Sequence, residues 1–191
     1  MREFVAVDVG PAPSSREGAA PAHLTLCFLG EVRPEVNGPI ADRLREVAAA
    51  SLPFVLRLEG LGAFPSAARP RVVWVGVTQG REEVVELARR VQQALADLLG
   101  TPAEEFVPHL TLFRVRSGAD RLAADELLAG RRPAPPPREV RITELLLKES
   151  VLRSSGAVHR TVEAWPLGRR EAGPPGDGRQ IPRGDPPRPR D

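Results

Sequence analysis

Cysteine is nearly absent from this chain of 191 residues, since Cys27 is the only one. A single cysteine excludes an intramolecular disulfide and any metal site built from several cysteines. No uninterrupted apolar run approaches the roughly 20 residues that a membrane-spanning helix needs, so no membrane segment is expected. Met1-Arg2-Glu3-Phe4 places an acidic residue early and lacks the layout of a signal peptide. A cytoplasmic protein is therefore expected.

An excess of basic charge is missing from most of the chain. The net charge is +2, and residues 168–191 account for it, because they carry six arginines and four acidic residues. Subtracting these from the totals of 27 and 25 leaves residues 1–167 with 21 basic and 21 acidic side chains. This balance excludes a broad basic surface of the kind that holds nucleic acid by releasing counterions. Any contact with nucleic acid should be local.

Sizeable apolar side chains are missing from the end of the chain. Residues 168–191 contain six prolines, five glycines and only Ile181 as a large apolar group. Such a segment cannot bury enough surface to offset the entropy of ordering it, which predicts a disordered tail. An arginine-rich arm that contacts RNA is the alternative, and the interspersed acids weaken it. One two-lobed domain is predicted over residues 1–167.

Hydrophobic periodicity predicts an α+β fold. The predicted strands are residues 4–9, 23–29, 54–61, 71–78, 109–115, 140–152 and 158–165, and the predicted helices are residues 34–50, 82–99 and 119–128. The loops are expected at residues 10–21, at the proline-rich connector 131–137 and at a turn over 154–156, where the last two strands pair. This order of elements argues for antiparallel sheets.

One tetrapeptide occurs twice in the chain. His23-Leu24-Thr25-Leu26 is repeated as His109-Leu110-Thr111-Leu112, so two of the three histidines open the same motif. Successive side chains of a strand point to opposite faces, so the histidine and threonine of each motif share one face and the leucines anchor the other. If a pseudo-twofold axis relates the two strands, their polar faces meet across one cleft that holds two imidazoles and two hydroxyls.

This set of groups suits phosphodiester chemistry. An imidazole has an ordinary pKa near 6.5, so one histidine can act as a base and the other as an acid at neutral pH. His23 and His109 are the candidate catalytic residues. Thr25 and Thr111 are the candidate phosphate-binding residues, because their hydroxyls can donate to the non-bridging oxygens where charge accumulates. The scheme requires neither a metal nor a cofactor.

The duplicated motif resembles the two-histidine (2H) phosphoesterase superfamily, and in it the RNA 2′,3′-cyclic phosphodiesterase branch, also called 2′-5′ RNA ligase. The stretches that carry the resemblance span residues 4 to about 167, and they are Phe4-Val5-Ala6-Val7-Asp8, His23-Leu24-Thr25-Leu26-Cys27-Phe28-Leu29-Gly30-Glu31, Arg71-Val72-Val73-Trp74-Val75-Gly76-Val77, Pro108-His109-Leu110-Thr111-Leu112-Phe113-Arg114-Val115 and Leu147-Lys148-Glu149-Ser150.

The resemblance implies a bilobal α+β fold of duplicated antiparallel sheets, with the helices outside and the active-site cleft between the lobes. It also implies hydrolysis of a terminal 2′,3′-cyclic phosphate to a 2′-phosphate, with a weak and reversible 2′-5′ joining of RNA ends. His23 would be the acid and His109 the base. The expected partners are RNA 3′ ends, tRNA fragments among them, or small cyclic nucleotides, and a monomer is expected.

The chain departs from the family pattern in two places. Family members usually place a helix and a short extended segment between the first strand and the first motif, and residues 10–22 are too short for both. That region normally helps to wall the site. The second departure is His159, where the family often has tyrosine. A surface strand position is the simpler interpretation of His159 than a third catalytic group.

Three further residues are candidates for substrate contact. Phe113 lies on the histidine face by strict alternation, where it can stack on a base or pack in the core. Arg114 falls on the leucine face, so it reaches solvent or a carboxylate unless a β-bulge turns it toward the cleft. Arg71 can guide a phosphate or be a solvated strand end. Cys27 is interpreted as inert, and Trp74 and Trp165 as core residues.

Four hypotheses follow. The leading one is a metal-independent cyclic phosphodiesterase, and the second is an ATP-independent 2′-5′ RNA ligase. Both fit the absence of a glycine-rich nucleotide loop. The third is a non-catalytic protein that binds RNA ends, which does not explain two titratable imidazoles. A zinc site is the fourth, and three histidines in all make it the poorest.

Overall fold

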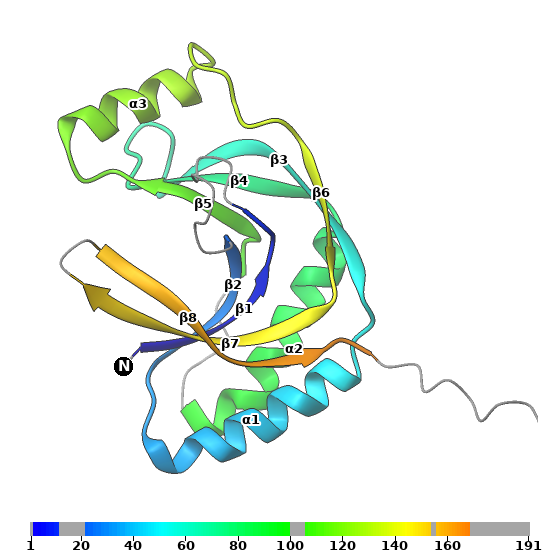
Figure 1. Cartoon of the computed structure of the whole chain (residues 1–191). Coiled ribbons are helices and arrows are strands. Elements are labelled where there is room, and N and C mark those ends of the chain that lie inside the picture. The colour runs from blue at the N-terminus through cyan, green and yellow to red at the C-terminus, as the bar shows by residue number, and fades with distance from the viewer. Residues whose placement is uncertain (1, 12–21, 100–105, 154–155, 169–191) are drawn as a thin grey trace, which may run out of the picture.

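The computed structural model describes residues 2–11, 22–99, 106–153 and 156–168 (Figure 1). Most of the predicted loop at 10–21, most of the turn at 154–156 and nearly all of the predicted tail lie outside the described residues. Within these ranges no helix is long and apolar enough to span a membrane.

The described strands form two four-stranded antiparallel sheets. The first sheet has the order β2-β1-β7-β8 and is built from Arg2–Asp8 (β1), His23–Glu31 (β2), Glu144–Arg153 (β7) and Gly156–Pro166 (β8). The second has the order β5-β4-β3-β6 and is built from Phe54–Phe64 (β3), Val72–Gln79 (β4), His109–Arg114 (β5) and Arg138–Ile142 (β6). The predicted α+β class is confirmed.

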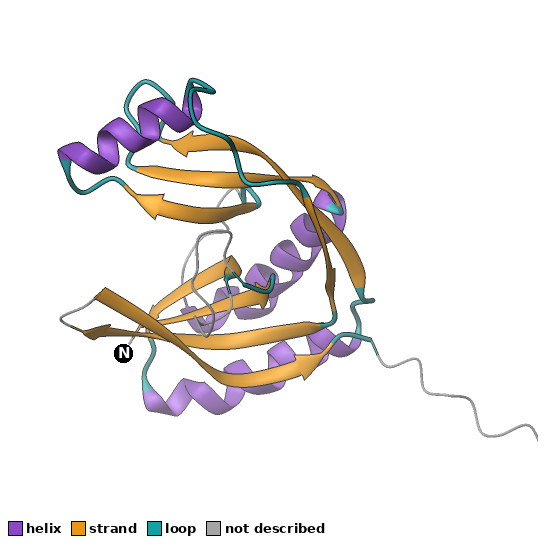
Figure 2. Ribbon diagram, turned by 45° about the horizontal axis from the view of Figure 1, so that its top comes forward, coloured by secondary structure: helices purple, strands orange, loops and turns teal. Residues whose placement is uncertain are grey.

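Two of the three helices in the described part of the chain lie together and the third lies apart (Figure 2). Pro34–Ala49 (α1) and Arg81–Leu99 (α2) contact each other. Their apolar stripes join the inner faces of both sheets in one buried core, which includes Leu24, Leu44, Val75, Val91 and Leu110. The two sheets therefore share one core.

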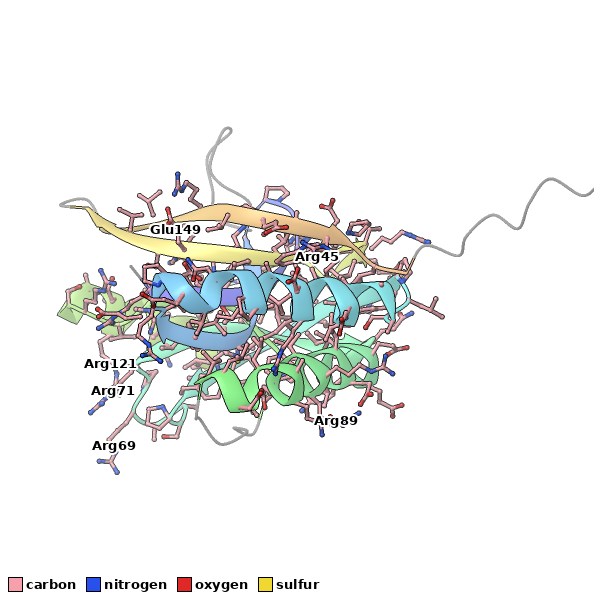
Figure 3. The ribbon with its side chains drawn as sticks, turned by 90° about the horizontal axis from the view of Figure 1, so that it is seen from below. Arg45, Arg69, Arg71, Arg89, Arg121 and Glu149 are labelled. Atoms are coloured by element: carbon pink, nitrogen blue, oxygen red, sulfur yellow. The ribbon has the colours of Figure 1, made fainter. Side chains whose placement is uncertain are left out.

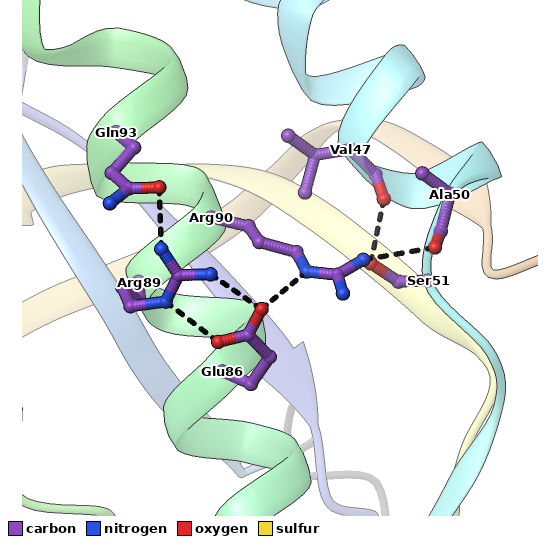
Figure 4. Close-up of polar contacts among 7 residues, drawn as sticks. All are labelled: Val47, Ala50, Ser51, Glu86, Arg89, Arg90 and Gln93. Atoms are coloured by element: carbon purple, nitrogen blue, oxygen red, sulfur yellow. Dashed lines mark hydrogen bonds and ion pairs between the residues drawn. The ribbon is translucent and has the colours of Figure 1, made fainter.

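Polar contacts reinforce the packing of α1 against α2 (Figure 4). Glu86 accepts hydrogen bonds from Arg89 and Arg90 on the same helix. Arg90 also donates to the carbonyl of Ala50 at the end of α1, at 3.0 Å. Exposed ion pairs such as those of Glu86 contribute little to stability, so the buried core remains the main attachment between the helices.

The third helix, Gly118–Leu128 (α3), covers one end of the second sheet. Ser117 and Asp120 form a capping box, in which each side chain accepts a hydrogen bond from the other residue's backbone and the first turn is satisfied. Ala124 and Leu127 of α3 pack against Val73 of β4 in a small second cluster. The short helix thus has both a start signal and a buried face.

One predicted strand, residues 140–152, is wrong in the structure, because the chain forms two strands there. β6 pairs with β3 in the second sheet, and β7 pairs with β1 and β8 in the first. The break falls at Thr143, whose carbonyl accepts a hydrogen bond from the backbone of Leu167 at 2.8 Å. The residues of both strands have the sequence pattern of a strand, so this pattern could not reveal that the chain passes from one sheet to the other.

The two motifs occupy equivalent places in the two sheets. Each begins an edge strand, β2 or β5, and these two strands are in contact. In both motifs the residue after the threonine, Leu26 or Leu112, is skipped in the pairing with the neighbouring strand, which is the signature of a β-bulge. The predicted duplication therefore extends to an irregularity of the backbone.

Candidate active site

Side chains alternate between the two faces of the strand from the histidine to the threonine of each motif. Leu24 and Leu110 are buried to 2% exposure or less, whereas the histidine and threonine on either side of each leucine are partly exposed. Cross-strand pairing also keeps them on one face, because His23 and Thr25 pair with alternate residues of β1, namely Asp8 and Ala6. Each sheet thus presents one imidazole and one hydroxyl on the face opposite its leucine anchor.

Two aromatic rings lie against the ring of the first histidine. The ring centroid of His23 lies 5.0 Å from that of Phe4 and 4.8 Å from that of His159. Phe4 and His159 are 5.2 Å apart and nearly perpendicular. Burial, followed by the charges of His159 and Lys148, lowers the pKa of His23 to about 4. His23 is therefore neutral in the free protein at neutral pH.

Lys148 is a buried cation next to these imidazoles. Its side chain is only 4% exposed, and its Nζ donates to Asp8 at 2.8 Å and to Thr161 at 3.2 Å. The ion pair joins β7 to β1, and the hydrogen bond to Thr161 joins β7 to β8, so Lys148 links three strands of the first sheet. Lys148 is the only lysine in the chain. Its place in Leu147-Lys148-Glu149-Ser150, one of the stretches that carry the family resemblance, is a second sequence signal that points to it.

His159 is half-buried rather than a surface strand residue. Its Nδ1 is buried and has no hydrogen-bond partner among the described residues. Burial, then the charges of Lys148 and Arg114, lowers the pKa of His159. Arg114 belongs to the second sheet and His159 to the first, and the contact between β5 and β2 joins the two sheets here.

The second histidine is oriented by the backbone carbonyl of Val107, two residues before it. Nδ1 of His109 lies 2.8 Å from the carbonyl of Val107, and because a carbonyl only accepts, Nδ1 carries the proton. The neutral tautomer then has its lone pair on Nε2. The ring contacts Phe64 at 4.9 Å and Trp74 at 6.1 Å between centroids.

Trp74 lies on the His109 face instead of in the core. It is half-buried, and the next position of β4 on that face, Gly76, pairs with His109. A Cβ atom at Gly62 would come within 2.2 Å of the indole, so this glycine lets the ring lie across the sheet. The interpretation of Trp74 as a core residue is wrong, whereas Trp165 is buried at 5% exposure.

The bulge settles which face Arg114 occupies. His109, Thr111 and Arg114 pair with Gly76, Trp74 and Val72, which are alternate residues of β4. Arg114 therefore shares the face of His109, as the alternative with a bulge predicted. Its side chain is exposed.

The other two candidates are placed away from the histidines. Phe113 packs in the cluster under α3, with Val73 opposite it in the sheet. Arg71 lies just before β4, where its backbone bonds to Phe64 and Val115. Its side chain is exposed and projects outward near that of Arg69 (Figure 3). Arg114 thus lies on the face of His109, and Phe113, predicted on that face, lies on the opposite one.

His23 should make the stability of the protein depend on pH. Its pKa in the folded protein, about 4, lies below the value of 6.5 of an unperturbed histidine, so the unfolded state binds more protons between these values. Stability should then fall as the pH is lowered from about 6.5 to about 4. We expect the melting temperature of the wild type to fall more steeply over this window than that of His23→Phe. Equal slopes would contradict the burial of a neutral imidazole.

Clusters of metal-ligating side chains are missing from the described part of the chain. Within residues 2–11, 22–99, 106–153 and 156–168, no three or more His, Cys, Asp or Glu side chains gather in a way that could hold a metal ion. The zinc hypothesis therefore has no set of ligands among these residues.

Comparison with known proteins gives the class to which this fold and this site belong. The paired motifs on two antiparallel sheets define a two-histidine phosphoesterase. The sequence matches the model of the 2′-5′ RNA ligase superfamily over residues 13–150, and the chain belongs to that superfamily.

Two curated relatives of the chain are both named RNA 2′,3′-cyclic phosphodiesterase. The RNA 2′,3′-cyclic phosphodiesterase of Aquifex aeolicus (strain VF5) is 34% identical over 148 residues, which cover 76% of this chain and 78% of the relative. The protein of that name from Aeropyrum pernix is 37% identical over 141 residues, with coverage of 73% and 78%.

Solved structures share the fold. TT0787 of Thermus thermophilus superposes with a TM-score of 0.66 at 27% identity, and the match covers 87% of this chain and 98% of TT0787. E. coli LigT complexed with phosphate superposes with a TM-score of 0.61 at 26% identity, with coverage of 88% and 98%.

Proposed function

We propose that this chain hydrolyses the 2′,3′-cyclic phosphate at the 3′ end of RNA to a 2′-phosphate, without a metal ion. The observation that carries the proposal is the equivalent placement of two His-x-Thr motifs on contacting edge strands, β2 and β5. The names of the curated relatives support this choice of substrate.

The second motif supplies the base. Nε2 of neutral His109 takes a proton from a water molecule as the water oxygen forms a bond to phosphorus. The bond between phosphorus and O3′ breaks, and the electron pair stays on O3′. Thr25 and Thr111 donate hydrogen bonds to the non-bridging oxygens, whose charge is greatest at this point.

The first motif supplies the acid once substrate is bound. Burial keeps His23 neutral in the free protein, so it must take up a proton before it can give one to O3′. A phosphate anion about 4 Å from the imidazolium of His23 would attract it by about 4 kcal/mol at an effective dielectric constant of about 20. This attraction would raise the pKa of His23 by about three, which is enough to offset the lowering that burial causes in the free protein. Substrate binding and protonation of His23 are therefore coupled.

The product of a single assay tests the proposal. A short RNA that ends in a 2′,3′-cyclic phosphate is incubated with the protein in EDTA, with and without a second RNA that has a 5′-hydroxyl. We expect a 2′-phosphate in both reactions. A 2′-5′-joined RNA as the main product would instead identify a ligase. Binding without any turnover by the folded protein would identify a protein that recognises RNA ends.

A further inference from the structure

The strand beside each motif carries a different residue opposite the threonine. Thr25 pairs with Ala6 of β1, whereas Thr111 pairs with Trp74 of β4. Because the two motifs occupy equivalent places in their sheets, a methyl group in one lobe corresponds to an indole in the other. The second lobe therefore has a large ring on its site face that the first lobe lacks.

A glycine on the next strand provides the space for this indole. Trp74 pairs with Gly62 of β3 on its other side. A Cβ atom at Gly62 would lie 2.2 Å from Cη2 and Cζ2 of the indole and 2.6 Å from its Cε2. Carbon atoms in contact are normally about 3.5 to 4.0 Å apart, so any other residue here would displace the ring by about 1 Å or more. The φ of Gly62 lies outside the left-handed region, so this position requires the missing side chain and not a special backbone.

Packing alone holds the indole in this place. Its Nε1 is buried and has no hydrogen-bond partner among the described residues. The N–H of a buried tryptophan usually finds an acceptor, and leaving it unpaired lowers stability. An unpaired buried donor next to the proposed base indicates that the ring is placed here for the site rather than for the fold.

Two rings support the imidazole of His109. The ring of Phe64 lies 4.9 Å from the imidazole, nearly perpendicular to it, and 5.3 Å from the indole of Trp74. The indole lies 6.1 Å from the imidazole. The hydrogen bond to the carbonyl of Val107 fixes Nδ1, and the two rings limit how the imidazole can turn about that point.

The direction in which the indole can be displaced matters for the site. The order of the strands is β5-β4-β3, and Trp74 lies on β4 between Gly62 of β3 and the motif strand β5. A side chain at position 62 would push the indole away from β3, toward His109 and Thr111. The glycine therefore keeps a large ring beside the base and away from the threonine.

We propose that Trp74 is a positioning residue for the base His109, and that Gly62 provides the space in which its indole is held. This inference rests on the proposed function, in which Nε2 of His109 takes a proton from water. Trp74 acts through His109 and takes no part in the proton transfer itself. A misplacement of about 1 Å can lower the rate of an enzyme about 100-fold.

The test measures kcat and KM of Gly62→Ala on an RNA 2′,3′-cyclic phosphate. We expect kcat to fall by about 10- to 100-fold, with KM changed by no more than about twofold, because a displaced base loses an interaction made in the transition state. In a Trp74→Phe background the same substitution should lower kcat by no more than about twofold, since a phenyl ring lacks the outer half of the indole that the new methyl group meets. Gly38→Ala in α1 is the matched control, because a Cβ there meets nothing within 4 Å, and it should leave kcat unchanged.

The tautomer of His109 gives a readout that a loss of stability alone would not change. In the wild type the neutral ring carries its proton on Nδ1, which donates to Val107. Nitrogen NMR at about pH 8, above the ordinary imidazole pKa near 6.5, should show this single tautomer. In Gly62→Ala the displaced ring weakens that hydrogen bond, so both tautomers should be populated. Gly38→Ala should retain one.

Two kinetic results overturn the inference. They are a kcat of Gly62→Ala within about twofold of the wild type, or an equal loss of kcat with Trp74 present and in the Trp74→Phe background. Should Gly62→Ala not fold, Trp74→Phe with both kcat and the tautomer unchanged would also overturn it. Failure of the proposed function is separate, because the wild type would then turn over no cyclic phosphate. A single, unchanged tautomer in Gly62→Ala would in that case contradict the positioning role.

Discussion

Replacing His109 with alanine lowers kcat/KM for an RNA 2′,3′-cyclic phosphate by about 100- to 10,000-fold, the usual contribution of one general acid or base. The backbone carbonyl of Val107 accepts from Nδ1 of His109, so Nε2 is the nitrogen of the neutral ring that can accept a proton. The measurement is the initial rate of hydrolysis in EDTA. His23→Ala should show a loss of similar size, because the leaving oxygen then has no proton donor.

Two controls accompany these variants, a measurement of secondary structure and a double variant of the two histidines. Circular dichroism should show that both variants keep their secondary structure. If His23 and His109 act on one phosphate, the double variant should lose far less than the product of the two single losses, since residues that act as a unit are not additive. A tenfold loss or less in either single variant, with the fold intact, would contradict the proposed pair.

Replacing Asp8 with asparagine lowers the free energy of unfolding by about 2 to 3 kcal/mol. The change leaves the ammonium of Lys148, which is 4% exposed, without its carboxylate. Breaking a buried ion pair usually costs about 3 to 5 kcal/mol, and the lower figure applies here because Asp8 itself is 32% exposed. The melting temperature should fall by roughly 4–12 °C, as expected for a chain of this size. Thermal unfolding at neutral pH measures it.

Two further variants identify the cause. Asp8→Asn combined with Lys148→Met removes both charges and should recover most of the loss, because a buried pair replaced by apolar groups is often neutral. Glu139→Gln breaks the exposed pair with Arg57 and should cost less than about 1 kcal/mol. A loss in Asp8→Asn no larger than in Glu139→Gln would show that the Lys148 pair is not structurally important.

Much of the site could be predicted from the sequence, because alternation is a local property. The two motifs predict the buried leucines and the shared face of histidine and threonine. The structure agrees for Leu24, Leu26 and Leu110, whereas Leu112 is only partly buried. A bulge before Arg114 is only an alternative in the sequence, and the bulge at Leu26 is not predicted, since a skipped residue is defined by the neighbouring strand. The two bulges reverse the faces assigned to Phe113 and Arg114 and place Phe28 on the histidine face.

The surroundings of the first histidine depend on contacts between distant segments. Phe4, Lys148 and His159 come from β1, β7 and β8, and only the pairing of these strands brings them to His23. Strand propensity shows that these segments are extended, but it does not show which lie side by side. The same limit explains why the pattern of residues 140–152 predicts one strand, although these residues belong to two sheets.

The most direct test of the central claim, that both motifs bind one phosphate, is a crystal structure of the wild-type protein with adenosine 2′-phosphate. The account predicts a single phosphate contacted by His23 and Thr25 from one lobe and by His109 and Thr111 from the other. A phosphate held by one motif alone, or bound away from both, would contradict it.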